Sequence, residues 1–163
     1  MKIKMFLSLL ASMIIAVSVF AGDGKTGYTG NWKIDKVKSS ASSSSLLLSE
    51  ISITVKNDSL LTMRTYESSN GESYVFNENL TLDSKEHNIV IYEMPRKAKA
   101  QWSEKGSSLL IESTTTFTNG SGEQNVTSTE TWTLSESGNQ LTYDFVTKTS
   151  EGSVKGTLYF NKS

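Results

Sequence analysis

The residues with catalytic potential are few, and the first of them is the single histidine of this 163-residue chain. His87 lies in or beside a predicted turn, Lys85-Glu86-His87-Asn88. Without a cysteine or a second histidine, the usual zinc sites cannot be assembled. No serine stands in a Gly-x-Ser-x-Gly turn that could use His87 as its base. The sequence therefore favours an exposed turn histidine over a catalytic base, and it predicts neither a metal nor a cofactor.

Two glutamates are the next candidates for chemistry. Glu78 shares its parity with the apolar Phe76 and Leu80, and Glu130 shares its parity with Trp132. Two inward carboxylates could act as acid and base in a glycosidase-like pair, or they could bind the polar head of a ligand. The alternative is that a β-bulge turns each glutamate outward, or that each lies at a wet barrel mouth. The second reading is preferred because a buried, unpaired carboxylate is costly, so we predict no enzymatic activity.

The basic residues show no pattern typical of an anion site. Arg64 is opposite in parity to Leu61 and Met63 and is expected to face solvent. Lys97 and Lys99 alternate with small apolar residues, which is typical of a solvated strand face. The net charge of −1 also disfavours nucleic acid or an anionic membrane as a partner, because both require a basic face.

The N-terminus has the pattern of a cleaved signal peptide. A basic start, Met1–Lys4, precedes the uncharged stretch Met5–Phe20 and the small residue Ala21. The stretch is short for a membrane span, which needs about 20 apolar residues, although an N-terminal anchor is the alternative. We therefore expect a signal peptide over 1–21, a flexible segment over 22–29 and one domain over 30–163. The protein is expected to be exported, to the periplasm or beyond, with no stable membrane span after cleavage.

The elements that must position these residues are β-strands. Apolar residues recur at every second position, as in Ile51, Ile53 and Val55, and no 3.6-residue period persists beyond Gly22. Turn signals such as Asn70-Gly71 separate the runs at short intervals. The pattern predicts an all-β fold: an antiparallel up-and-down meander of about 8–10 strands, closed into a barrel that leaves no exposed edge.

Two other β architectures compete with this one. A two-sheet sandwich fits the same strands. An outer-membrane barrel also suits alternating strands behind a signal peptide, but Lys, Glu and Asp occupy the faces where lipid would require an apolar band. The polar run Ser39–Ser45, between the first two strands, is expected to be a flexible loop, or else a lid over a barrel mouth.

Several short motifs resemble those of lipocalin-like, calycin-type secreted bacterial domains of uncharacterised function. The Gly-x-Trp opening of the first strand is Gly30-Asn31-Trp32, two Trp-turn-Gly-Leu hairpins follow, and the chain ends in Leu158–Lys162. The resemblance implies a barrel that holds a small apolar molecule. It also implies a structural plug, in which Trp32 packs at the closed end under a basic residue of the last strand, here Lys162. The first strand should then pair with the last.

The predicted function is that of an exported, non-enzymatic barrel that binds a small, largely apolar ligand inside. Free volume is expected beside Ala98 and Ala100, the smallest inward residues. The predicted ligand-binding residues all have inward parity: Tyr74, Phe76, Glu78, Ala98, Ala100, Ile111, Glu130 and Tyr143. The alternative is a barrel filled by its own side chains that acts through its surface, as a structural or interaction protein of the cell envelope.

Overall fold

The computed structural model describes residues 25–41, 46–120 and 122–163. The predicted signal peptide, the start of the 22–29 segment and part of the Ser39–Ser45 run lie outside the described residues. The described elements are one short 3-10 helix and a set of β-strands: η1 Thr26–Tyr28, β1 Gly30–Ile34, β2 Ser40–Ala41, β3 Leu46–Lys56, β4 Ser59–Ser68, β5 Ser73–Thr81, β6 His87–Ile91, β7 Met94–Trp102, β8 Ser108–Asn119, β9 Gly122–Leu134, β10 Gln140–Thr149 and β11 Gly152–Lys162. No helix among the described residues is long and apolar enough to cross a membrane.

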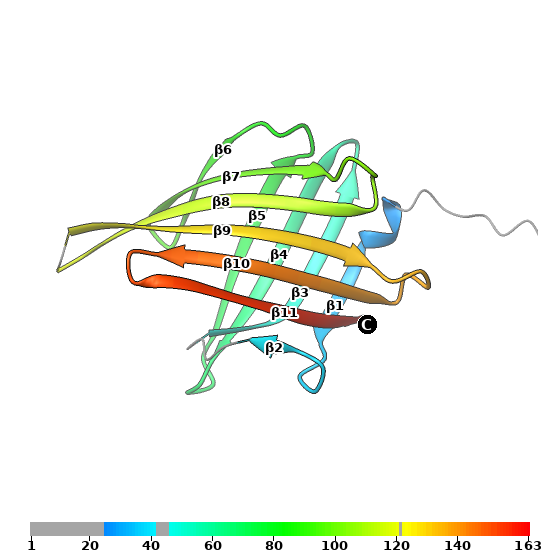
Figure 1. The fold of residues 1–163 in the computed structure, drawn as a ribbon, viewed down its shortest axis with the longest axis horizontal. Helices are drawn as coiled ribbons and strands as arrows, with labels where there is room; N and C mark the ends of the chain where they lie inside the picture. The colour runs from blue at the N-terminus through cyan, green and yellow to red at the C-terminus, as the bar shows by residue number, and fades with distance from the viewer. Residues whose placement is uncertain (1–24, 42–45, 121) are drawn as a thin grey trace, which may run out of the picture.

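The strands form one antiparallel sheet that curls into a nearly closed barrel. Its order is β5-β4-β3-β1-β11-β10-β9-β8-β7-β6, and β2 adds to β11. In Figure 1, β8–β11 run across the front, and β1, β3, β4 and β5 cross behind them at a steep angle. The predicted meander is confirmed, and the two-sheet sandwich is wrong, because one continuous sheet holds every described strand.

Closure of the barrel depends on β1, which pairs on both sides. Trp32 lies opposite Ile51 of β3 and opposite Lys162 of β11, and Ile34 lies opposite Phe160. The predicted pairing of the first and last strands is therefore confirmed. It removes two edges that would otherwise expose unpaired backbone groups.

The ladder is interrupted between β5 and β6, which are the two ends of the sheet order. The meander pattern predicts that every strand pairs with the next one. Here the chain leaves β5 and turns through Leu82–Glu86, where Ser84 has a φ of 65°. β6 then pairs with β7 alone among the described strands. We call this interruption the seam.

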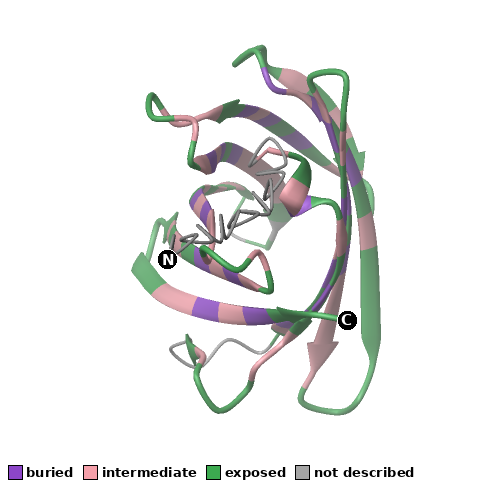
Figure 2. Cartoon of the chain, turned by 90° about the vertical axis from the view of Figure 1, so that its right-hand side faces the viewer, coloured by how far each residue is buried: buried purple, intermediate pink, exposed green. Residues whose placement is uncertain are grey.

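Burial follows the alternation of the strands. Figure 2 shows the strands surrounding the interior, with buried and more exposed residues alternating along them. One half of the barrel, which we call the closed half, is packed with apolar side chains. Its fully buried large residues include Tyr28, Trp32, Leu60, Leu80, Leu109, Ile111, Trp132, Leu141 and Phe160.

The closed half is covered at its end by η1. Tyr28 was expected within a flexible segment, yet it is buried. Its hydroxyl donates to the carbonyl of Trp132 at 2.8 Å and approaches that of Ser107 at 3.1 Å. Its ring meets Trp102 edge-on, with ring centroids 5.4 Å apart. These contacts hold η1 across the end of the barrel.

Candidate functional site

Four charged side chains meet inside the barrel at the inner boundary of the closed half. Arg64 of β4 donates from Nη1 to Oε1 of Glu130 at 2.8 Å and from Nη2 to Oε2 of Glu78 at 3.1 Å. Arg96 of β7 donates from Nε to the other Glu78 oxygen at 2.9 Å. All four residues are buried. We call them the ionic layer.

Aromatic rings and one further donor complete the surroundings of the ionic layer. The indole N–H of Trp132 donates to Oε2 of Glu130 at 3.1 Å. The guanidinium of Arg64 lies 5.1 Å from the ring centroid of Trp132 and 5.3 Å from that of Phe76. These distances are typical of cation–π contacts, which are strongest where water is excluded.

The opposite charges of the ionic layer stabilise one another in their charged forms. Burial opposes the charge of Arg64, but Glu130 and Glu78 outweigh it, so the pKa of the guanidinium is raised further above its usual range. Burial, and then the nearby Glu130 carboxylate, raise the pKa of Tyr143 well above 10. Two arginines balance two glutamates, as a group of buried charges requires.

This arrangement does not suit acid–base chemistry. Each carboxylate oxygen of Glu78 and Glu130 accepts a hydrogen bond from Arg64, Arg96 or Trp132. A general base must come within hydrogen-bond reach of a substrate proton. Both glutamates are buried and ion-paired with arginine, so the glycosidase-like interpretation gains no support from this geometry.

The preferred alternative for the glutamates was also wrong. Neither residue is turned outward by a bulge or placed in water; both are buried and paired. Arg64 was expected to face solvent, yet it is among the most deeply buried side chains. Leu61 and Met63 point outward instead, and they are 43% and 47% exposed. On β4 the even-numbered residues face inward and the odd-numbered ones face outward, which is the reverse of the predicted assignment.

Sequence reasoning missed Arg96 altogether. A usable signal was present, because Arg96 has the same parity as Ala98 and Ala100, whose inward direction is observed. An arginine on the inner parity of β7 and a glutamate on that of β5 could have been matched as a buried pair. Lys97 and Lys99 do point outward, and Lys99 pairs with Glu112 at the surface.

The remaining predicted ligand-binding residues separate into two groups. Ala98, Ala100, Ile111 and Tyr143 are all buried, so none of them faces the accessible part of the interior. Tyr74 lies at the opposite end of the barrel, 39% exposed, where its ring meets Tyr92 edge-on.

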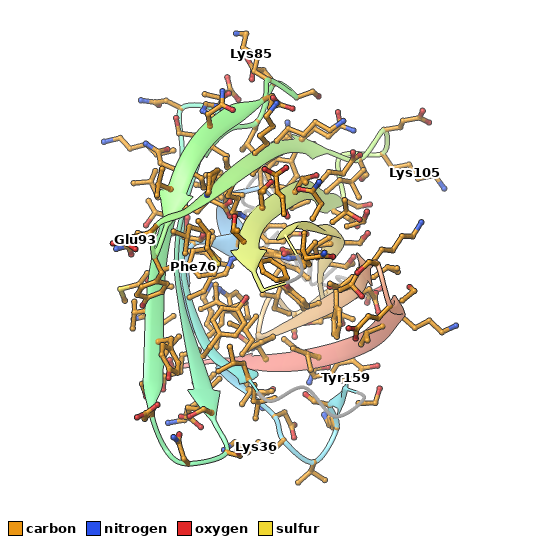
Figure 3. All side chains as sticks on the ribbon, turned by 90° about the vertical axis from the view of Figure 1, so that its left-hand side faces the viewer. Lys36, Phe76, Lys85, Glu93, Lys105 and Tyr159 are labelled. Atoms are coloured by element: carbon orange, nitrogen blue, oxygen red, sulfur yellow. The ribbon has the colours of Figure 1, made fainter. Side chains whose placement is uncertain are left out.

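Beyond the ionic layer, the inward side chains are more accessible. We call this part the open half. These residues alternate with outward ones and are only half-buried: Tyr66, Phe76, Phe117, Val126, Ser128, Phe145 and Thr147. Phe76, labelled in Figure 3, points inward from β5 at this level, and its ring stacks on Tyr66 with centroids 5.8 Å apart. Aromatic rings and hydroxyls together make a surface typical of small-molecule sites.

Two surface depressions involve little of the open half, and Phe145 is the one residue of it that borders either of them. One, of about 510 Å³, lies over β9–β11, with Thr129, Asp144 and Lys155 in its wall. The other, of about 720 Å³, surrounds the turn between β7 and β8 and includes Trp102 and Lys105. Neither contains a predicted ligand-binding residue.

Trp32 and Lys162 lie together at the closed end. Trp32 is buried, and its indole N–H donates to the carbonyl of Tyr28 at 2.9 Å. Lys162 Nζ is 5.1 Å from the ring centroid and donates to the carbonyl of Gly27 at 3.0 Å. The plug role predicted for this pair stays a prediction until the stability of variants at the two positions is measured.

His87 differs from its predicted setting. It begins β6 and is half-buried rather than exposed in a turn. Its Nε2 accepts the backbone N–H of Thr81 at 3.1 Å and lies 2.8 Å from the Thr81 hydroxyl. Among the described residues, no carboxylate is hydrogen-bonded to it as the orienting partner of a catalytic base would be.

The fold defines the class of this chain: an all-β, antiparallel meander curled into a nearly closed barrel. No family model matches the sequence, and no curated protein does. Among solved structures, the chain is similar to zebrafish ileal bile acid-binding protein complexed with cholic acid. The two share 13% identity over 84% of this chain and 99% of that one, with a TM-score of 0.48.

Proposed function

We propose that this protein binds a small, largely apolar ligand in the open half of its barrel, above the ionic layer, without transforming it. The observation that supports the proposal is the contrast along the strands. Most inward side chains are fully buried up to the ionic layer, and most are half-buried beyond it. Such an arrangement gives a rigid, closed base and an accessible aromatic wall, which suits the burial of a small apolar molecule.

The ionic layer forms the floor of this site. Arg96, 8% exposed, is its most accessible member, and it also donates to the hydroxyl of Thr115 at 3.2 Å. The ligand would therefore place its apolar body against rings such as Tyr66 and Phe145, and any polar group toward the floor.

A paired set of tryptophan variants tests the site. Ser128 is half-buried and faces inward from β9, whereas the nearby Thr127 faces outward. We expect an amphipathic fluorescent probe, 1-anilinonaphthalene-8-sulfonate, to bind saturably to the wild type. Ser128→Trp should weaken its binding at least tenfold, whereas Thr127→Trp should leave it unchanged. Equal binding by both variants would overturn the proposal.

The close packing of the closed half and the ionic layer favours a second function. A barrel filled by its own side chains would act through its surface in the cell envelope. Absence of saturable probe binding, together with no co-purified small molecule in native mass spectrometry, would favour this role.

Export is the remaining part of the proposal, and it is supported by the residue pattern of 1–21. Intact mass measurement of the protein recovered from expressing cells tests it. A mature chain that begins at Gly22 is expected, and a full-length intracellular chain would contradict export.

A further inference from the structure

Along β5 and β6 the seam is closed by side chains, whereas the rest of the barrel is closed by backbone hydrogen bonds. Backbone pairing resumes just after β5, where the N–H of Ser84 donates to the carbonyl of Ala100 on β7 at 3.0 Å. The backbone groups of the odd-numbered residues Val75 and Thr81 of β5 hydrogen-bond across the seam. Because backbone groups alternate sides along an antiparallel strand, those of the even-numbered residues point toward β4. The backbone groups of Asn77 and Asn79 therefore face the seam as well. Both residues are exposed, and no described residue hydrogen-bonds to these groups.

Three side-chain bridges cross the seam. The hydroxyl of Tyr92 donates to the carbonyl of Val75 at 2.6 Å and accepts its N–H at 2.9 Å. At the other end, His87 accepts the N–H of Thr81. On the inner side, Arg96 of β7 binds Glu78 of β5. The Glu78–Arg96 bridge is buried, whereas Tyr92 is 59% exposed.

Tyr92 occupies a position that its backbone does not favour. Tyr92 and Glu93 form the two-residue turn between β6 and β7, with φ values of 48° and 66°. Such a turn favours Asn-Gly or Asp-Gly, and a tyrosine with positive φ is strained. The hydroxyl compensates by replacing two missing ladder bonds across the seam. Figure 3 shows this turn at Glu93, near Phe76.

We propose that the β6–β7 hairpin is a flap, that the Tyr92 hydroxyl is its clasp, and that release of the clasp opens the seam next to the open half. The clasp is exposed and consists of one hydroxyl, so water can replace it at small cost. The β6 edge has no ladder to break, which makes the seam the weakest line of the barrel. The role of the seam as the entry route rests on the proposed function; its opening does not.

Cysteine labelling tests the opening, because the chain contains no cysteine of its own. Ala98→Cys places a thiol on the buried face of β7, behind the seam. Ser49→Cys places one at a buried position of β3, away from the seam. We expect Ala98→Cys to react with a thiol reagent through local opening, with weak dependence on urea. Ser49→Cys should react only through global unfolding.

Two substitutions at the clasp sharpen the test. Tyr92→Phe removes the hydroxyl and should accelerate labelling of Ala98→Cys roughly 3- to 10-fold, as expected for a lost hydrogen bond, without accelerating that of Ser49→Cys. Tyr92→Asn should accelerate it as well, although asparagine suits the turn better. Equal acceleration at both thiols, or none at Ala98→Cys, would contradict the proposal that the Tyr92 hydroxyl holds the seam closed.

The entry route has its own measurement. In stopped-flow experiments with the naphthalene sulfonate probe, Tyr92→Phe should raise the association and dissociation rates together and leave the affinity unchanged. If the probe binds and its rates do not change, the seam is not the entrance. If the probe does not bind at all, the proposed function fails while the labelling result stands.

Discussion

Arg96 and Glu78 form an ion pair between two strands that share no backbone ladder: Nε of Arg96 on β7 lies 2.9 Å from Oε1 of Glu78 on β5. Glu78 binds Arg64 of the neighbouring strand with its other oxygen. One carboxylate therefore ties together the two sides of the seam from within. Buried charges that seemed candidates for chemistry serve here to close the barrel.

Neutralising Glu78 should destabilise the fold severely. In Glu78→Gln, the buried Arg96 loses its carboxylate partner and Arg64 keeps only that of Glu130. Breaking a buried ion pair costs about 3–5 kcal/mol. Urea unfolding measures the loss. The control is Glu112→Gln, which breaks the exposed pair with Lys99 and should cost less than about 1 kcal/mol. Similar midpoints for the two variants would contradict a structural role for the ionic layer.

The Trp32 plug can be separated from its lysine. Trp32→Ala empties a buried site and should cost about 3–5 kcal/mol. Lys162→Ala removes an exposed cation–π partner and should cost about 1 kcal/mol or less. Both values come from urea melts. A Trp32→Ala midpoint equal to that of the wild type would show that the indole does not support the closed end.

Gly156 should tolerate no side chain. An added Cβ would lie 2.6 Å from the carbonyl oxygen of Ser40 and 2.9 Å from two ring atoms of Phe145. Gly156→Ala should therefore cost about 1–3 kcal/mol, as overpacking does. The matched control is Gly120→Ala, where an added Cβ meets nothing within 4 Å. Equal thermal midpoints would show that β2 gives way at Ser40.

Alkaline pH should weaken the cap formed by η1. Burial raises the pKa of Tyr28 to about 12, from 10.0 in the unfolded chain. The unfolded state loses this proton first, so stability is fully present below pH 10 and falls as the pH rises to 12. The loss reaches about 3 kcal/mol. Tyr28→Phe should be less stable at neutral pH and should lose less stability between pH 10 and 12; a loss as steep as that of the wild type would contradict this.

The fold was largely predictable because its signal is repeated along the chain. Alternation and turn residues recur in most hairpins, and Asn57-Asp58 forms the two-residue turn with positive φ that such a pair favours. Pairing of β1 with β11 followed from the cost of exposed edges. The seam was not predictable in this way, because Tyr92-Glu93 carries no turn signal and the gap depends on tertiary packing.

The candidate site was predicted only in part. Glu78 and Glu130 were placed on the inner face, but the same parity was not applied to Arg64 and Arg96. A single charged side chain on the inner face of one strand would be too costly to bury by itself. Burial becomes possible only because four strands bring opposite charges together inside the barrel. Tyr74 shows the converse limit: parity gives the direction of a side chain and not its depth along the barrel.

The pairing of β1 with β11 has a consequence for the order of folding. The hairpins of β3–β4 and β8–β9 join near neighbours, whereas Trp32 and Lys162 are separated by almost the whole described chain. Closing so long a loop is entropically expensive, so it should come late and limit the rate. In pulse-labelling hydrogen exchange during refolding, amides of β8 and β9 should be protected before those of β1. Until then β1 presents an open edge, and the folding intermediate carries an aggregation risk that the native barrel has removed.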